Sequence, residues 1–177
     1  MRVTLSPDAE WRAIGNEVAD QRGILVSFVL PLAGIPAASW CLGLLLFGDA
    51  PSIELAWIVH RGAIVYFGSV LSIFLLAAAL FVLAPLFATA RDWPRALQVA
   101  AYSSAPVLLA GFVLVVPGLA FATLPAAFYS FYLQYIAVNC VLGVKDEQAA
   151  EYVALGIVLL VLASTLVGAF GSWLGIL

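Results

Sequence analysis

Residues 102–135 read YSSAPVLLAGFVLVVPGLAFATLPAAFYSFYLQY, and this stretch decides the expected fold. It is apolar almost throughout and is divided by Pro117-Gly118. Proline fixes one backbone dihedral and glycine tolerates positive φ, so this pair is typical of a tight turn. The pattern predicts two membrane helices that fold back on each other as antiparallel neighbours, with almost no loop between them.

The composition of the whole chain indicates a membrane protein. Of 177 residues, 65% are hydrophobic and 10% are charged, whereas about a quarter of the residues of a soluble domain are charged. Several apolar runs exceed the ~20 residues that a helix needs to cross a bilayer, and they lack the alternating pattern of membrane strands. The sequence therefore predicts an all-α integral membrane protein: a bundle of five transmembrane helices preceded by a short amphipathic N-terminal helix.

The expected spans are residues 24–47, 62–88, 97–117, 119–142 and 152–177. Pro31 and Pro36 lie in the first span and should kink it, because each proline removes a backbone donor. Residues 48–61 form a polar linker that carries His60. These boundaries divide the chain into a cytoplasmic amphipathic segment, residues 1–23, and a five-helix membrane domain, residues 24–177.

Residues 6–22 have the signals of a short helix, with Ser6 as N-cap and Pro7 in the first turn. Trp11 lies on its apolar face. Two interpretations are open. The helix lies on the membrane surface with Trp11 as its anchor, or it caps the bundle or recruits a partner.

Positive charge predicts the topology. With a cytoplasmic N-terminus and five spans, six of the seven Lys and Arg residues lie inside and only Arg61 lies outside, as the positive-inside rule requires. The C-terminus is then extracytoplasmic. Cys41 and Cys140 differ in depth by ~20 Å at 1.5 Å per residue, which excludes a disulfide between them.

Four segments resemble the Yip family, the Ypt/Rab-interacting membrane proteins, and in particular its compact bacterial members. They are SPDAEWRAIGNE, PLAGIP, AYSSAPVLLAGFVLVVPGL and YSFYLQY. The resemblance covers essentially the whole chain and implies a five-helix Yip domain in the bacterial inner (plasma) membrane, with the N-terminus cytoplasmic. Bacterial members often have a glycine and a proline where this chain has Ala137 and Asn139. Eukaryotic relatives bind Rab GTPases through longer N-terminal regions, so the resemblance implies no GTPase binding here.

The fourth expected span carries polar residues on two faces. At 100° per residue, Tyr132, Tyr135 and Asn139 share one arc with Tyr129 beside it, and Gln134 lies in another. Polar groups in a membrane seek protein partners, so this helix should be central. Tyr132, Tyr135 and Gln134 should then be shielded from lipid, while most of the second span faces lipid. Two interpretations remain: a polar path or ligand site, or packing through interhelical hydrogen bonds.

Two other groups of residues are candidates for binding. The cytoplasmic acidic residues form either a solvated surface or a mouth that responds to cations or protons; they are Glu17, Asp20, Asp146, Glu147 and Glu151. The fifth span has a small-residue face suited to close packing within the chain or to self-association; it comprises Ser164, Gly168, Ser172 and the pair Gly171 and Gly175. The expected partners are membrane lipids, other membrane proteins or a second copy.

Signatures of chemistry are missing from the sequence. It contains no nucleophile elbow, P-loop, zinc-ligand spacing or dinucleotide fingerprint, so no catalytic residue, cofactor or metal is expected. A net charge of −3 without a Lys/Arg cluster argues against nucleic acid as a partner. The leading hypothesis is a non-catalytic membrane scaffold, organiser or partner-binding protein. The rival is a small transporter, channel or lipid scramblase with a polar path beside the fourth span.

Overall fold

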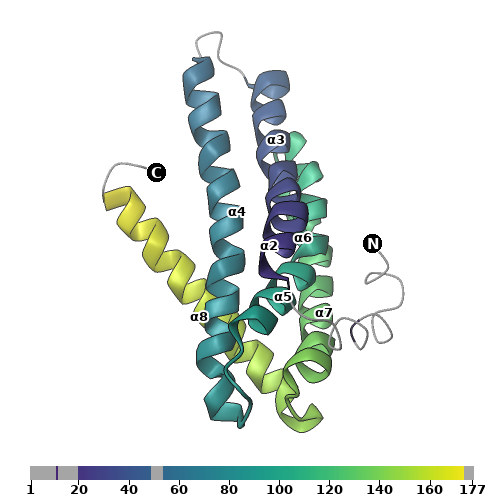
Figure 1. Cartoon of the computed structure of the whole chain (residues 1–177). Helices are drawn as coiled ribbons and strands as arrows, with labels where there is room; N and C mark the ends of the chain where they lie inside the picture. The colour runs from purple at the N-terminus through teal and green to yellow at the C-terminus, as the bar shows by residue number, and fades with distance from the viewer. Residues whose placement is uncertain (1–10, 12–19, 49–53, 174–177) are drawn as a thin grey trace.

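The computed structural model describes Trp11 and residues 20–48 and 54–173, and every regular element in this part of the chain is a helix (Figure 1). In chain order the elements are α2 (Gln21–Ile24), the π-helical turn η1 (Leu25–Val29), α3 (Leu30–Phe47), α4 (Leu55–Leu83), the 3-10 helix η2 (Ala84–Phe87), α5 (Trp93–Ser103), α6 (Ala105–Ala110), the 3-10 helices η3 (Gly111–Val115) and η4 (Ala120–Thr123), α7 (Leu124–Leu142) and α8 (Asp146–Trp173).

Four helical stretches are long and apolar enough to cross a membrane: Gln21–Phe47, Leu55–Phe87, Trp93–Val115 and Asp146–Trp173. The remaining expected span, the fourth in chain order (residues 119–142), corresponds to α7, whose 19 residues extend about 28 Å at 1.5 Å per residue. Its polar side chains make it less apolar than the other four. The expected bundle is thus confirmed as helical and apolar, with four of its five spans meeting both criteria.

The first span is irregular close to its first proline. Leu30 donates its backbone N–H to the carbonyl of Leu25, five residues earlier, which closes the π-helical turn. Pro31 follows at once, and a proline ring crowds the carbonyl four residues before it. A π turn widens the backbone there, and such turns are among the known causes of bends in helices. The structure therefore shows an irregular turn at Leu25–Val29, and the kink expected at Pro31 and Pro36 stays a prediction.

Three helices begin earlier than predicted. α4 starts at Leu55, not at residue 62, so the expected linker 48–61 is shorter and His60 and Arg61 are helical. The Arg61 guanidinium lies 5.4 Å from the ring centre of Trp57, one turn back, and this contact keeps the charged residue compatible with the helix.

α5 and α8 begin early because their first turns use charged residues. Asp92 caps α5 by accepting the N–H of Arg95 at 3.2 Å, and Pro94 follows in the first turn. α8 starts with Asp146 and Glu147, whose negative charge suits the positive end of a helix. The polar turns thus belong partly to the helices that follow them.

α4 lies at the centre of the assembly and packs against α3, α5 and α8 (Figure 1). Small residues permit these approaches: Ala77 and Ala79 are buried, and Gly62 lies directly against the sulfur of Cys41. The expectation that most of the second span faces lipid is therefore wrong. α5 is enclosed even more completely, since every residue from Ala96 to Ala101 is buried.

The reversal of the chain at Pro117-Gly118 occurs as predicted, and Gly118 has φ +86°. The connection is longer than a single tight turn, because η3 and η4 flank it. Close contact with α3 accompanies η3: a Cβ on Gly43 would lie 2.6 Å from the carbonyl oxygen of Val115, and one on Gly111 would lie 2.7 Å from Cβ of Pro36. α7 then packs against α6 and α5, as expected for antiparallel neighbours.

Candidate functional site on α7

α7 divides its side chains between the bundle interior and the outside. The interior face is buried and comprises Ser130, Leu133, Gln134, Ala137, Val138 and Val141. The opposite side, which we call the α7 outer face, comprises Phe128, Phe131, Tyr132 and Tyr135. Their spacing of i, i+3, i+4 and i+7 places these four rings on one side of the helix.

The structure separates the polar residues that the sequence grouped on this helix. Gln134 points inward and is 2% exposed, whereas Tyr132 is 50% and Tyr135 36% exposed. The ring of Tyr129 lies 6.0 Å from that of Tyr132, and Asn139 is half-buried. The prediction that both tyrosines are shielded is wrong for a single chain, although it holds for Gln134.

Gln134 lies where α4, α7 and α8 meet. Gly156 of α8 leaves room for its amide, because a Cβ there would lie 3.8 Å from Gln134 Nε2 and 3.3 Å from Cδ2 of Leu80. Tyr152, also on α8, donates its hydroxyl to the carbonyl of Leu80 and packs edge-on against Phe87. These contacts join the lower part of α8 to α4 and enclose the amide.

Three buried polar atoms of α7 have no hydrogen-bond partner among the described residues: Ser130 Oγ, Gln134 Nε2 and Asn139 Oδ1. Burying such atoms without a partner is unfavourable. These atoms therefore do not supply the interhelical hydrogen bonds that one interpretation of the sequence invoked. Packing holds this part of the helix in place.

The N-terminal segment contacts the bundle through Trp11, which is fully buried. Its ring meets that of Tyr102 at 6.3 Å, and Tyr102 in turn meets Phe28 edge-on at 4.9 Å. Trp11 thus caps the bundle and does not act as an anchor on the membrane surface. The remainder of the predicted helix 6–22, apart from its last residues, lies outside the described residues.

The residues of the candidate acidic mouth are exposed wherever the structure describes them. Asp20, Asp146, Glu147 and Glu151 are exposed, and Glu17 lies outside the described residues. Within the described part of the chain, no three His, Cys, Asp or Glu residues are grouped as a metal site would require. Whether these carboxylates respond to cations or protons stays a prediction.

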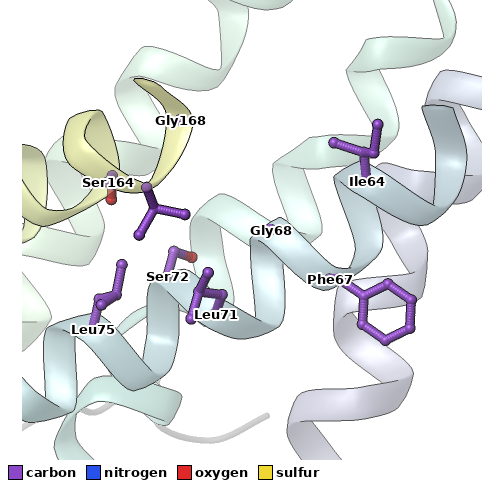
Figure 2. A pocket seen from close by; sticks show the side chains of 9 residues that line it. Ile64, Phe67, Gly68, Leu71, Ser72, Leu75, Ser164 and Gly168 are labelled. Carbon is purple, nitrogen blue, oxygen red and sulfur yellow. The ribbon is translucent and has the colours of Figure 1, made fainter. Parts of the chain in front are cut away.

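The small-residue face of α8 is turned toward α4. Ser164 and Gly168 line a groove of about 350 Å³ together with Gly68 and Ser72 of α4 (Figure 2). The remaining lining residues are apolar: Ile64, Phe67, Leu71, Leu75 and Val167. α8 leans away from α4 beyond its first turns (Figure 1), so this face neither packs fully within the chain nor points directly outward. Ser172 is exposed, and Gly175 lies outside the described residues.

Sequence reasoning missed Phe128 and Phe131 as members of the outer face, although their helical spacing with Tyr132 and Tyr135 was visible. It also missed the buried role of Tyr152, whereas capping by the helix that carries Trp11 was one of its two interpretations. No local pattern indicates that an aromatic residue near a polar turn inserts into the bundle interior.

The fold and the apolar helices define a helical membrane protein. A family model, the Yip1 domain, matches residues 1–168. The chain therefore belongs to the Yip1 domain family, a family of non-enzymatic membrane proteins. Searches of curated proteins and of solved structures found no match.

Proposed function

We propose that this protein acts by interaction, as a non-catalytic scaffold, membrane organiser or partner-binding protein. One observation carries the proposal: Gln134, the most polar side chain near the middle of α7, is 2% exposed and lies beside Gly156 of α8. A path for a solute would need such a group to face water or substrate. Membership of a non-enzymatic membrane family supports the same conclusion.

The proposal counts α7 as a membrane span, which makes five in all, and places the protein in the bacterial inner membrane with a cytoplasmic N-terminus. The length of α7 is about 28 Å, at 1.5 Å for each of its 19 residues. This length is close to the ~30 Å thickness of the hydrocarbon core of a bilayer. The charge distribution supports this orientation, since six of the seven basic residues then lie inside.

Transport assays test the proposal directly. Purified protein in liposomes is expected to move ions, small solutes and labelled lipids no faster than protein-free liposomes do. The matched variants are Tyr132→Ala and Asn139→Ala on α7, with Leu166→Ala on α8 as a control at an exposed position. A flux that the α7 variants abolish and the control retains would establish a transporter and reject the scaffold.

A lipid scramblase is the second candidate, favoured by the groove between α4 and α8. Lipid transfer through this groove would be lost in Gly68→Leu and Gly168→Leu, because a Cβ at either glycine meets no atom within 4 Å and a larger side chain would occupy the space. Scrambling that only these variants abolish would support this candidate over the scaffold.

A further inference from the structure

The hydroxyl groups of Tyr132 and Tyr135 differ in environment from those of Tyr66 and Tyr152. Several serines and threonines donate to carbonyls of their own helices: Ser69 Oγ donates to Val65 O at 2.8 Å, and Thr165 Oγ1 to Val161 O at 2.8 Å. A tyrosine hydroxyl is too far from its own backbone to do so. Tyr66 and Tyr152 donate instead to carbonyls of other helices, those of Leu30 and Leu80. Neither Tyr132 nor Tyr135 has such a partner among the described residues.

Both hydroxyls lie at an unfavourable depth. Tyr132 and Tyr135 are within two residues of Leu133, the central residue of α7, and therefore within ~3 Å of its midpoint along the helix axis. Tyrosine favours the two membrane–water interfaces, where its hydroxyl meets water. Lipid tails at the bilayer centre offer neither donor nor acceptor. The α7 outer face therefore needs a protein surface with polar groups at the same depth.

A second copy of this chain meets that need by symmetry. All copies insert in the same orientation, so the twofold axis of a dimer lies along the membrane normal and the two α7 helices run parallel. Each residue then meets its counterpart at its own depth. A hydroxyl both donates and accepts, so tyrosines that face each other are self-complementary.

We propose that the α7 outer face is a homodimer interface in which tyrosine hydroxyls of two copies hydrogen-bond near the bilayer centre. This inference rests on the proposed function, which counts α7 as a span, and it names the partner. Phe128, which is 69% exposed, and Phe131 extend the contact by about one turn with rings that pack without polar groups. On α8, by comparison, the hydroxyl of Thr165 is already bonded within its own helix.

Equilibrium measurements test the interface. Fluorescently labelled protein is diluted across a range of protein-to-lipid ratios in phosphatidylcholine vesicles, and energy transfer reports the dimer. Replacing both tyrosines by phenylalanine removes only the hydroxyls, so the dissociation constant should rise about three- to fifteen-fold, as expected for interhelical hydrogen bonds in membranes. Leu166→Ala on α8 should leave the constant unchanged.

Cross-linking provides an independent measurement that does not depend on the hydroxyls. In a Cys41→Ser, Cys140→Ser background, Tyr132→Cys should form disulfide dimers on mild oxidation, and Leu166→Cys should not. Two results together would overturn the proposal: Tyr132→Cys cross-links no more than Leu166→Cys, and the phenylalanine variant has an unchanged dissociation constant. They would mean that lipid covers this face. Pairing of Tyr132→Cys with another protein in native membranes, and not with itself, would also overturn it. Absence of the dimer without any solute or lipid flux would leave the proposed function intact.

Discussion

At the scale of single residues, the amide nitrogen of Gln134 distinguishes a packing role for α7 from a transport role. It is buried without a hydrogen-bond partner among the described residues, so an apolar residue of similar size removes an unfavourable group. Replacing a poorly satisfied buried polar group by an apolar one is nearly neutral or stabilising.

We therefore expect Gln134→Leu to be as stable as the parent chain, or more stable by about 1 kcal/mol. Unfolding in detergent, followed by circular dichroism, measures this change. Gln134→Ala is the control, because it removes the same amide but leaves a void and should cost about 2 kcal/mol or more. A large loss of stability in Gln134→Leu would show that the amide has a bonding partner and would contradict the packing described here.

Trp11 yields a second residue-scale prediction. Its ring is fully buried against Tyr102, so Trp11→Ala should lower the free energy of unfolding by about 3 kcal/mol, the lower end for removing a buried large aromatic. Trp173 is 79% exposed, and Trp173→Ala should have little effect in the same unfolding measurement. Equal effects of the two variants would place Trp11 on the membrane surface after all.

At the scale of elements, the sequence predicted the helices and the reversal at Pro117-Gly118 but placed several boundaries too late. The early starts of α4, α5 and α8 depend on charged residues in or near the first turn. In α4 the Arg61 guanidinium lies over the ring of Trp57, and Asp92 is the N-cap of α5. A hydropathy pattern assigns such residues to loops. Their helical state follows from capping and stacking contacts.

The turn itself can be tested by substitution. Gly118 has φ +86°, and a Cβ there meets no atom within 4 Å, so the cost of a side chain is that of the backbone alone. Gly118→Val should lower stability by about 1–2 kcal/mol. Gly118→Asn should lose less, because asparagine tolerates this conformation, and thermal unfolding of the two variants should show this order. Equal losses would mean that crowding, and not the dihedral angle, limits this position.

At the scale of the whole molecule, the class of protein followed from composition, whereas the arrangement of the helices did not. Polar stripes on α7 correctly indicated that Gln134 faces protein. The same argument failed for Tyr132 and Tyr135, because one sequence shows that a face needs a partner but not whether the partner is in the same chain. The central position of α4 could not be predicted from the sequence for a similar reason, since an apolar helix suits lipid and protein contacts equally well.

The proposed topology is tested by labelling single cysteines in a chain that lacks Cys41 and Cys140. Both test positions are exposed: Ala90, in the turn before α5, and Leu55, at the start of α4. A membrane-impermeant thiol reagent added to intact cells should label Leu55→Cys and leave Ala90→Cys unlabelled until the membrane is opened. The reverse pattern would invert the whole assignment.

The π-helical turn before Pro31 has a consequence for how the chain tolerates changes in length. Each residue of an α-helix adds about 100° of rotation, so deleting one residue within α3 would turn every preceding side chain onto a different side of the bundle. The turn at Leu25–Val29 already contains one residue more than an α-helical turn closed by the same donor, Leu30. A single deletion there can be absorbed by reversion to α-helical bonding, which would keep the preceding residues on the side of the bundle where Trp11 meets Tyr102. Capping of the bundle by the N-terminal segment thus depends on the number of residues in the first helical stretch as well as on their chemistry.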